Sequence, residues 1–173
     1  IEFAPYDGEE LVFEEKIFGG SVPKNFFPAV EKGLQEGAEH GSIGGFPVVK
    51  LKATLIDGSY HPVDSSEMAF KTAASMALRD CMKEAQPYLL EPLQSLTILV
   101  PDDKQGDVMS VLSKRRGSVL GMNSIGGGMT ELTAEAPEAE MVDFALVLRQ
   151  ITQGLGEFTA EFARYEMLPA GTE

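Results

Sequence analysis

Apolar and polar residues follow strand and helix periods most clearly in the first half of the chain. β-Branched and aliphatic residues fill positions 46–56, which predicts a strand. Residues 50–55 alternate between polar and apolar, so one face, with Leu51, Ala53 and Leu55, is expected to be buried and the other, with Lys50, Lys52 and Thr54, to face water. From residue 67 to residue 86, apolar residues recur every three or four positions, which predicts an amphipathic helix.

A short loop joins this strand to this helix. Asp57-Gly58-Ser59 has the composition of a tight turn, because glycine tolerates backbone angles that a reversal needs. Tyr60-His61-Pro62 follows, where side chains are expected to point outward. Asp64 precedes Glu67 by three residues, which is capping-box spacing, so Asp64 is the expected helix cap. The loop is therefore predicted to project between a rigid strand and a rigid helix.

Short strands and helices are also predicted elsewhere. Residues 1–4 and 11–20 have strand patterns, and an apolar stripe predicts a helix that begins near Lys24 and ends at Glu39. The chain opens on the first of these strands without an initiator methionine, so we expect it to be a fragment.

The second half has a different order of elements, β-α-β-β-α-β, which is the split βαβ arrangement of ferredoxin-like domains. Its strands are expected at residues 96–100, 118–125, 129–136 and 157–165, with helices before Gly117 and after Pro137. The sequence therefore predicts an α+β fold of two small domains, residues 1–91 and residues 92–173.

Composition limits the kind of surface that the chain can offer. The 173 residues are 43% hydrophobic, enough for packed cores, and the net charge is −13. Residues 1–92 hold 8 basic and 15 acidic residues, and residues 93–173 hold 6 and 12. Neither half is basic, whereas phosphate binding rests on clustered Lys and Arg. RNA contact would therefore require a small neutral or basic tip on an acidic body.

Residues suited to catalysis or metal binding are sparse. The sequence has no GxxxxGK[ST] phosphate loop and no GxSxG motif, and its two histidines are too few for a histidine metal site. Cys81 lies on the apolar face of the predicted helix and is expected in the core. We expect no catalytic, cofactor-binding or metal-binding residue, no membrane association, and a cytoplasmic monomer.

Two places remain as candidate contact sites. His61 lies on the projecting loop, although an exposed loop histidine without a function is the alternative. Arg115-Arg116 is an adjacent pair of arginines in an acidic half, and its alternative role is to compensate the dipole at a helix end.

The projecting loop and its flanks resemble a known protein family. GFPVV (Gly45–Val49), GSYHPVDSSEMAF (Gly58–Phe70) and LLEP (Leu89–Pro92) are similar to the fourth domain of elongation factor G, the GTP-hydrolysing ribosomal translocase. The resemblance continues through Gly106–Met122, Ala139–Met141 and Leu148–Pro169, so it covers nearly the whole chain.

The resemblance implies an S5-like α+β domain, truncated at its N-terminus and lacking its first tip loop, followed by a ferredoxin-like fifth domain. It implies that GTP and Mg²⁺ bind in a missing N-terminal domain. The partners would be the ribosome, with ribosomal RNA, tRNA, mRNA and ribosomal proteins. The loop residues Gly58, Ser59, Tyr60 and His61 would contact tRNA and mRNA at the decoding site, and Arg115 and Arg116 would be further ribosome contacts.

Two alternatives remain open. One is a paralogue of the same family that recycles or protects ribosomes. The other belongs to a different class, a free-standing ferredoxin-like module that binds a ligand.

Overall fold

The computed structural model describes residues 1–171, which form two compact units. The first unit is Ile1–Tyr88, and the second begins at Leu89. The first contains β1 (Glu2–Pro5), β2 (Val12–Glu15), α1 (Phe27–Glu39), β3 (Leu51–Leu55) and α2 (Glu67–Glu84). The second contains β4 (Leu90–Pro101), α3 (Gln105–Lys114), β5 (Ser118–Gly126), β6 (Met129–Pro137), α4 (Phe144–Ile151) and β7 (Glu157–Met167). Short 3₁₀ turns precede α1, α3 and α4.

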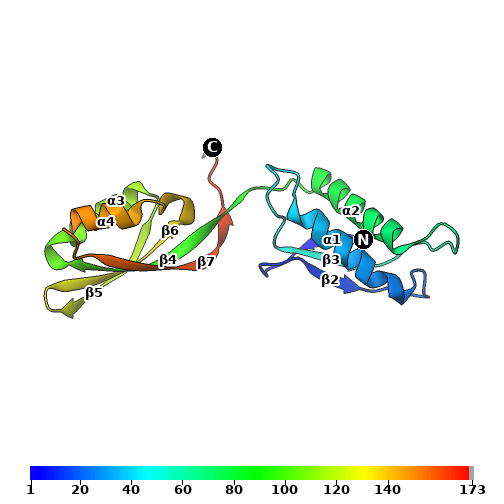
Figure 1. The fold of residues 1–173 in the computed structure, drawn as a ribbon, viewed down its shortest axis with the longest axis horizontal. Helices are drawn as coiled ribbons and strands as arrows, with labels where there is room; N and C mark the ends of the chain where they lie inside the picture. Colours follow the sequence, from blue (N-terminus) through cyan, green and yellow to red (C-terminus); the bar gives the residue numbers. More distant parts are fainter. Residues whose placement is uncertain (172–173) are drawn as a thin grey trace. The chain divides into compact units, whose positions relative to one another are not determined.

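The first unit packs two helices on a three-stranded sheet (Figure 1). β3 is the central strand, antiparallel to β1 and parallel to β2. The core lies between the sheet and the helices, and its fully buried side chains include Val22, Leu34, Ala53, Ala74 and Leu78. Because β2 and β3 are parallel, their C-terminal ends meet at one edge of the sheet.

The predicted strand 46–56 is shorter in the structure, because its first half is a loop. Lys50 has a φ of +57°, which interrupts the extended chain before Leu51. The Val48 amide donates instead to the Ala38 carbonyl oxygen at the end of α1, at 2.7 Å. Thr54, expected to face water, is buried, with 8% of its surface exposed.

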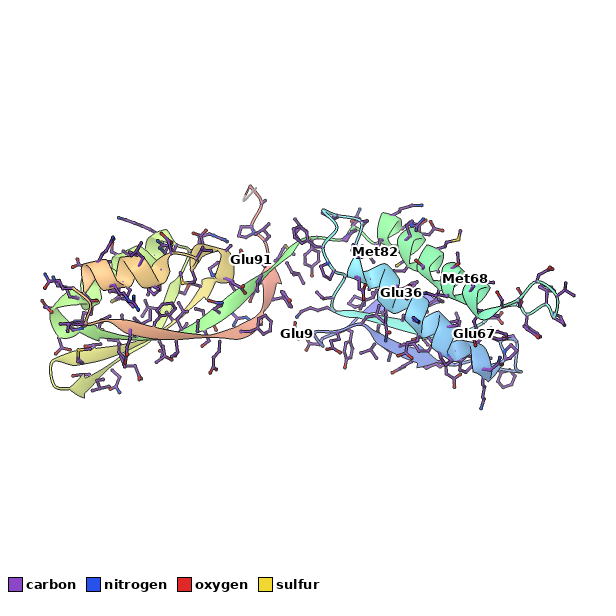
Figure 2. The ribbon with its side chains drawn as sticks, in the orientation of Figure 1. Glu9, Glu36, Glu67, Met68, Met82 and Glu91 are labelled. Carbon is purple, nitrogen blue, oxygen red and sulfur yellow. The ribbon has the colours of Figure 1, made fainter. Side chains whose placement is uncertain are left out.

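The N-cap of α2 is Ser66, not Asp64. The Ser66 hydroxyl oxygen accepts a hydrogen bond from the Ala69 amide at 3.1 Å, while Asp64 still belongs to the preceding turn. Glu67, labelled in Figure 2, is the first helical residue, where its charge is favourable to the helix dipole.

The second unit has the predicted ferredoxin-like fold. Its antiparallel sheet has the order β5-β6-β4-β7, and α3 and α4 cover one face (Figure 1). Leu96, Ile98, Leu112, Leu132 and Phe144 are buried between the sheet and the helices. α4 begins at Phe144, later than Pro137 suggested, because Glu138–Glu140 form a separate 3₁₀ turn.

We expect each unit to fold alone, because each has a core of its own. β4 begins at Leu90, so chains cut after residue 88 are better tests than chains cut at the predicted boundary after residue 91. Residues 1–88 and 89–173 should each show cooperative urea unfolding by circular dichroism. If either part stays unfolded while the intact chain folds, the two-domain division is wrong.

Candidate functional site

Two loops meet at the edge of the first unit where β2 and β3 end (Figure 1). We call residues 16–24 and 56–66 together the tip. The backbone joins the two loops at their base, since the Lys16 amide donates to the Leu55 carbonyl oxygen at 2.8 Å. The projecting loop predicted from the sequence is thus one half of a two-loop structure.

The loops also touch beyond their base. A Cβ atom added to Gly58 would lie 2.5 Å from the Val22 Cγ2 atom, and Val22 is 1% exposed. Gly58 is therefore required by the close approach of the other loop, and it is not among the glycines with positive φ. The expected reason for this glycine, a special turn conformation, was wrong.

Asp57 is held beside this contact. The pKa of the Asp57 carboxyl lies below its ordinary value because the Ser21 hydroxyl faces the carboxylate and the Gly58 amide donates to it at 2.8 Å. The buried Ser21 hydroxyl makes no hydrogen bond of good geometry. The hydrogen bond from the Gly58 amide therefore holds the Asp57 carboxylate in place. Both neighbours keep Asp57 charged.

Tyr60 anchors the tip to the core. Its ring centroid lies 5.6 Å from that of Phe26, which in turn stacks on Phe70 at 4.6 Å. Tyr60 remains 41% exposed, so one part of the ring packs and another part faces water. This placement gives Tyr60 a role in shaping the loop.

The backbone of His61 is tied on both sides, whereas its side chain is exposed. The His61 amide donates to the Ser65 hydroxyl oxygen at 2.9 Å, and the His61 carbonyl oxygen accepts from the Ser65 amide at 2.9 Å. The Asp64 amide donates to the same carbonyl oxygen at 3.2 Å. A fixed backbone thus presents the imidazole to solvent, next to exposed Ser59 and Pro62.

The tip differs in charge and polarity from the rest of the chain. It holds two lysines, Lys16 and Lys24, and two aspartates, Asp57 and Asp64, so its formal charge is zero in a chain of −13. Phe18 and Val63 are almost fully exposed there, at 94% and 92%. The structure therefore places a neutral tip on an acidic chain.

Arg115 and Arg116 belong to the second unit, whereas both tip loops belong to the first. Arg115 Nη1 donates to the Glu140 carbonyl oxygen at 2.6 Å and to Asp143 Oδ1 at 2.5 Å. The pKa of Arg115 is raised, and that of Asp143 lowered, by this charged hydrogen bond.

Arg116 forms a fork with Glu91, near the start of β4 (Figure 2), at 2.7 and 2.9 Å. Its Nε also donates to Glu140 at 3.1 Å, and these carboxylates raise the pKa of the guanidinium. Both arginines thus stabilise the second unit, and their contact with the ribosome stays a prediction.

The loop 16–24 is the part of the site that sequence reasoning missed. Its residues were assigned to the end of a strand and the start of a helix. The signal was Gly19-Gly20, both at a φ of +72°, directly after an apolar residue. The parallel pairing of β2 with β3, which places this loop beside residues 56–66, is not visible in the sequence.

Metal and membrane sites are not indicated by residues 1–171. No group of three or more His, Cys, Asp or Glu residues in this range could hold a metal ion. None of the helices formed by these residues is both long and apolar enough to cross a membrane.

Comparison with known proteins identifies both units. Residues 1–86 match the family model of elongation factor G, domain IV, and residues 88–172 match that of the elongation factor G C-terminus. An elongation factor G-like protein of Thermotoga maritima is 46% identical over 162 residues, which is 94% of this chain and 24% of that protein. A crystal structure of a protein from Thermus thermophilus superposes with a TM-score of 0.92 at 42% identity, over 97% of this chain and 25% of that chain.

The chain therefore spans about a quarter of the length of these relatives. The two family models together cover nearly all of it, in the order that the sequence resemblance implied. The chain belongs to the elongation factor G family and consists of its domain IV and its C-terminal domain.

Proposed function

We propose that this chain is the ribosome-binding part of a translocation factor, and that its tip contacts tRNA and mRNA at the decoding site. The observation that carries the proposal is His61, an exposed imidazole on a residue whose backbone amide and carbonyl oxygen are both hydrogen-bonded. A neutral imidazole can donate and accept hydrogen bonds and can stack on a base. The zero charge of the tip supports the proposal, because it lets a polyanion approach an otherwise acidic chain.

In this mechanism the chain performs no chemistry itself. GTP and Mg²⁺ would bind in another domain of the same factor, since the sequence has no phosphate loop. The first unit, with two helices packed on its sheet, would act as a rigid wedge that occupies the space left by a moving tRNA. The factor would work in the cytoplasm, with the ribosome as its partner.

A second candidate function is ribosome recycling or protection by a specialised member of the family. It is favoured by one observation, that the Thermotoga maritima relative is named elongation factor G-like protein. The full-length gene can be expressed in cells that are depleted of their own translocase. Growth of these cells would support the translocase function, and failure to grow would support the specialised function.

His61→Ala should leave the free energy of unfolding within about 0.5 kcal/mol of the parent value, because the side chain is exposed. In the full-length factor it should slow single-turnover translocation by about 2- to 10-fold, the effect of one lost hydrogen bond of roughly 0.5–1.5 kcal/mol. Ribosome-stimulated GTP hydrolysis should stay the same, because the nucleotide site lies on another domain.

The matched control is His40→Ala, which removes the chain's other histidine, also exposed but at the end of α1. This variant should translocate at the parent rate. Unchanged translocation in His61→Ala, or a strongly lowered melting temperature of that variant, would remove His61 from the proposed contact.

A further inference from the structure

Phe18 is the most exposed large apolar residue of the described chain, with 94% of its surface accessible. It lies in the loop 16–24, directly before Gly19 and Gly20, and both glycines have left-handed backbones with open space around them. The cores of both units are complete without it. Exposure of a whole aromatic ring to water is unfavourable, so this ring is available to pack against a partner.

The surroundings of Phe18 favour RNA as that partner. Lys16 and Lys24 are exposed on the same loop, and neither has a salt bridge among the described residues. The loop 16–24 contains no acidic residue of its own, and the carboxylate at its start is that of Glu15, which accepts from the Ile17 amide at 3.2 Å. An exposed aromatic ring on a loop that also carries lysines suits unpaired nucleotides, because the ring can stack on a base while the cations face phosphates.

Position supports the same partner. Contacts between Gly58 and Val22, and between the Lys16 amide and the Leu55 carbonyl oxygen, fix the loop 16–24 beside the loop that carries His61. Whatever RNA lies against His61 is therefore within reach of the neighbouring loop.

We propose that Phe18 stacks on an unpaired RNA base and forms a second contact of the tip. This inference rests on the proposed function of the tip, and it adds a residue and a mode of binding to it. Loss of one stacked base weakens binding by about 5- to 150-fold, so Phe18 can contribute as much as a hydrogen-bonding residue.

The test uses the full-length factor with programmed ribosomes, in the variants Phe18→Ala, Phe18→Trp and His61→Ala. Phe18→Ala should slow single-turnover translocation by about 5-fold or more. Phe18→Trp should restore a rate close to the parent value, because tryptophan also stacks. The melting temperature of all three proteins should match the parent, since Phe18 and His61 are exposed.

A photoreactive phenylalanine analogue at position 18 identifies the partner. We expect crosslinks to RNA bases, and comparison of vacant ribosomes, ribosomes with mRNA, and ribosomes with mRNA and tRNA shows which RNA supplies the base. This readout needs only ribosome binding, so it applies equally to a factor that acts in recycling.

Crosslinks to ribosomal proteins alone would overturn the inference. So would a parent rate in Phe18→Ala while His61→Ala is slow, a result that leaves the proposed function of the tip standing. If both variants translocate at the parent rate and position 18 gives no RNA crosslink, the inference and the proposed function both fail. Equal slowing in Phe18→Ala and Phe18→Trp with lowered melting temperatures would show a structural role instead.

Discussion

Gly33→Ala is expected to lower the free energy of unfolding of the first unit by about 2–4 kcal/mol. Gly33 is buried where α1 crosses α2, and an added Cβ would lie 2.2 Å from the Lys71 carbonyl oxygen and 3.0 Å from its Cα. These are backbone atoms of a helix, so no side-chain rotation relieves the clash and the two helices must separate. Separation would also disturb the salt bridge between Glu36, labelled on α1 in Figure 2, and Lys71, now 2.7 Å long. The higher helix propensity of alanine, about 1 kcal/mol, offsets only part of this.

Gly37→Ala, one turn further along the same helix, is the matched control. Its added Cβ would first meet the Leu78 Cδ2 atom at 3.2 Å and the Ser75 hydroxyl oxygen at 3.3 Å, which are ends of side chains. The free energy of unfolding should therefore change by less than about 1 kcal/mol, because the tighter packing lowers stability while the higher helix propensity of alanine raises it. Urea titration followed by circular dichroism measures both variants. Equal stability of the two would show that α1 and α2 are not held as closely as the structure has them.

The fold was predictable where the signal is local. The β-α-β-β-α-β order of the second unit follows from periodicity alone, and its sheet and the family model that matches residues 88–172 agree with it. The strand 46–56 was predicted too long, because residues 46–50 have strand propensity while tertiary contacts decide their backbone. The Val48 amide donates to the Ala38 carbonyl oxygen at the end of α1. Lys50 takes a left-handed backbone conformation, which a lysine in the sequence does not predict.

The site was predictable only in part, for the same reason. The loop with His61 has turn residues and a helix start behind it, so its existence follows from the sequence. The position of the loop 16–24 beside it depends on the parallel pairing of β2 with β3. That pairing joins residues far apart in the sequence, so local patterns do not reveal it. For Arg115 and Arg116 the sequence left two roles open, a ribosome contact and compensation of the helix dipole. It could not indicate that both side chains reach carboxylates 24 or more residues away in the chain, because these are long-range contacts.

Arg116→Ala is expected to cost the second unit about 2–4 kcal/mol. It removes the two hydrogen bonds to Glu91 and the one to Glu140, and it leaves Glu91, whose side chain is 11% exposed, as a nearly buried charge without its partner. The estimate is below that for a fully buried pair, because the Arg116 side chain is itself 30% exposed. Urea unfolding of the second unit measures the loss.

Arg116→Gly distinguishes the stability lost with the ion pairs from the stability lost through backbone strain. Arg116 has a φ of +57° after the C-terminus of α3, where the Gly117 amide donates to the Leu112 carbonyl oxygen at 2.8 Å, the arrangement that usually places glycine at this position. Glycine therefore loses the same carboxylate contacts but avoids the left-handed strain of about 1 kcal/mol, so the Arg116→Gly variant should be more stable than Arg116→Ala by that amount.

The stability of Arg116→Lys should lie between those of the parent and Arg116→Ala, because an ammonium keeps the charge but not the fork. In Glu91→Ala combined with Arg116→Ala, the loss should be smaller than the sum of the two single losses, because each single variant already breaks the pair. A parent-like stability of Arg116→Ala would show that the fork with Glu91 does not hold β4 to the end of α3, and would leave Arg116 available for a contact with the ribosome.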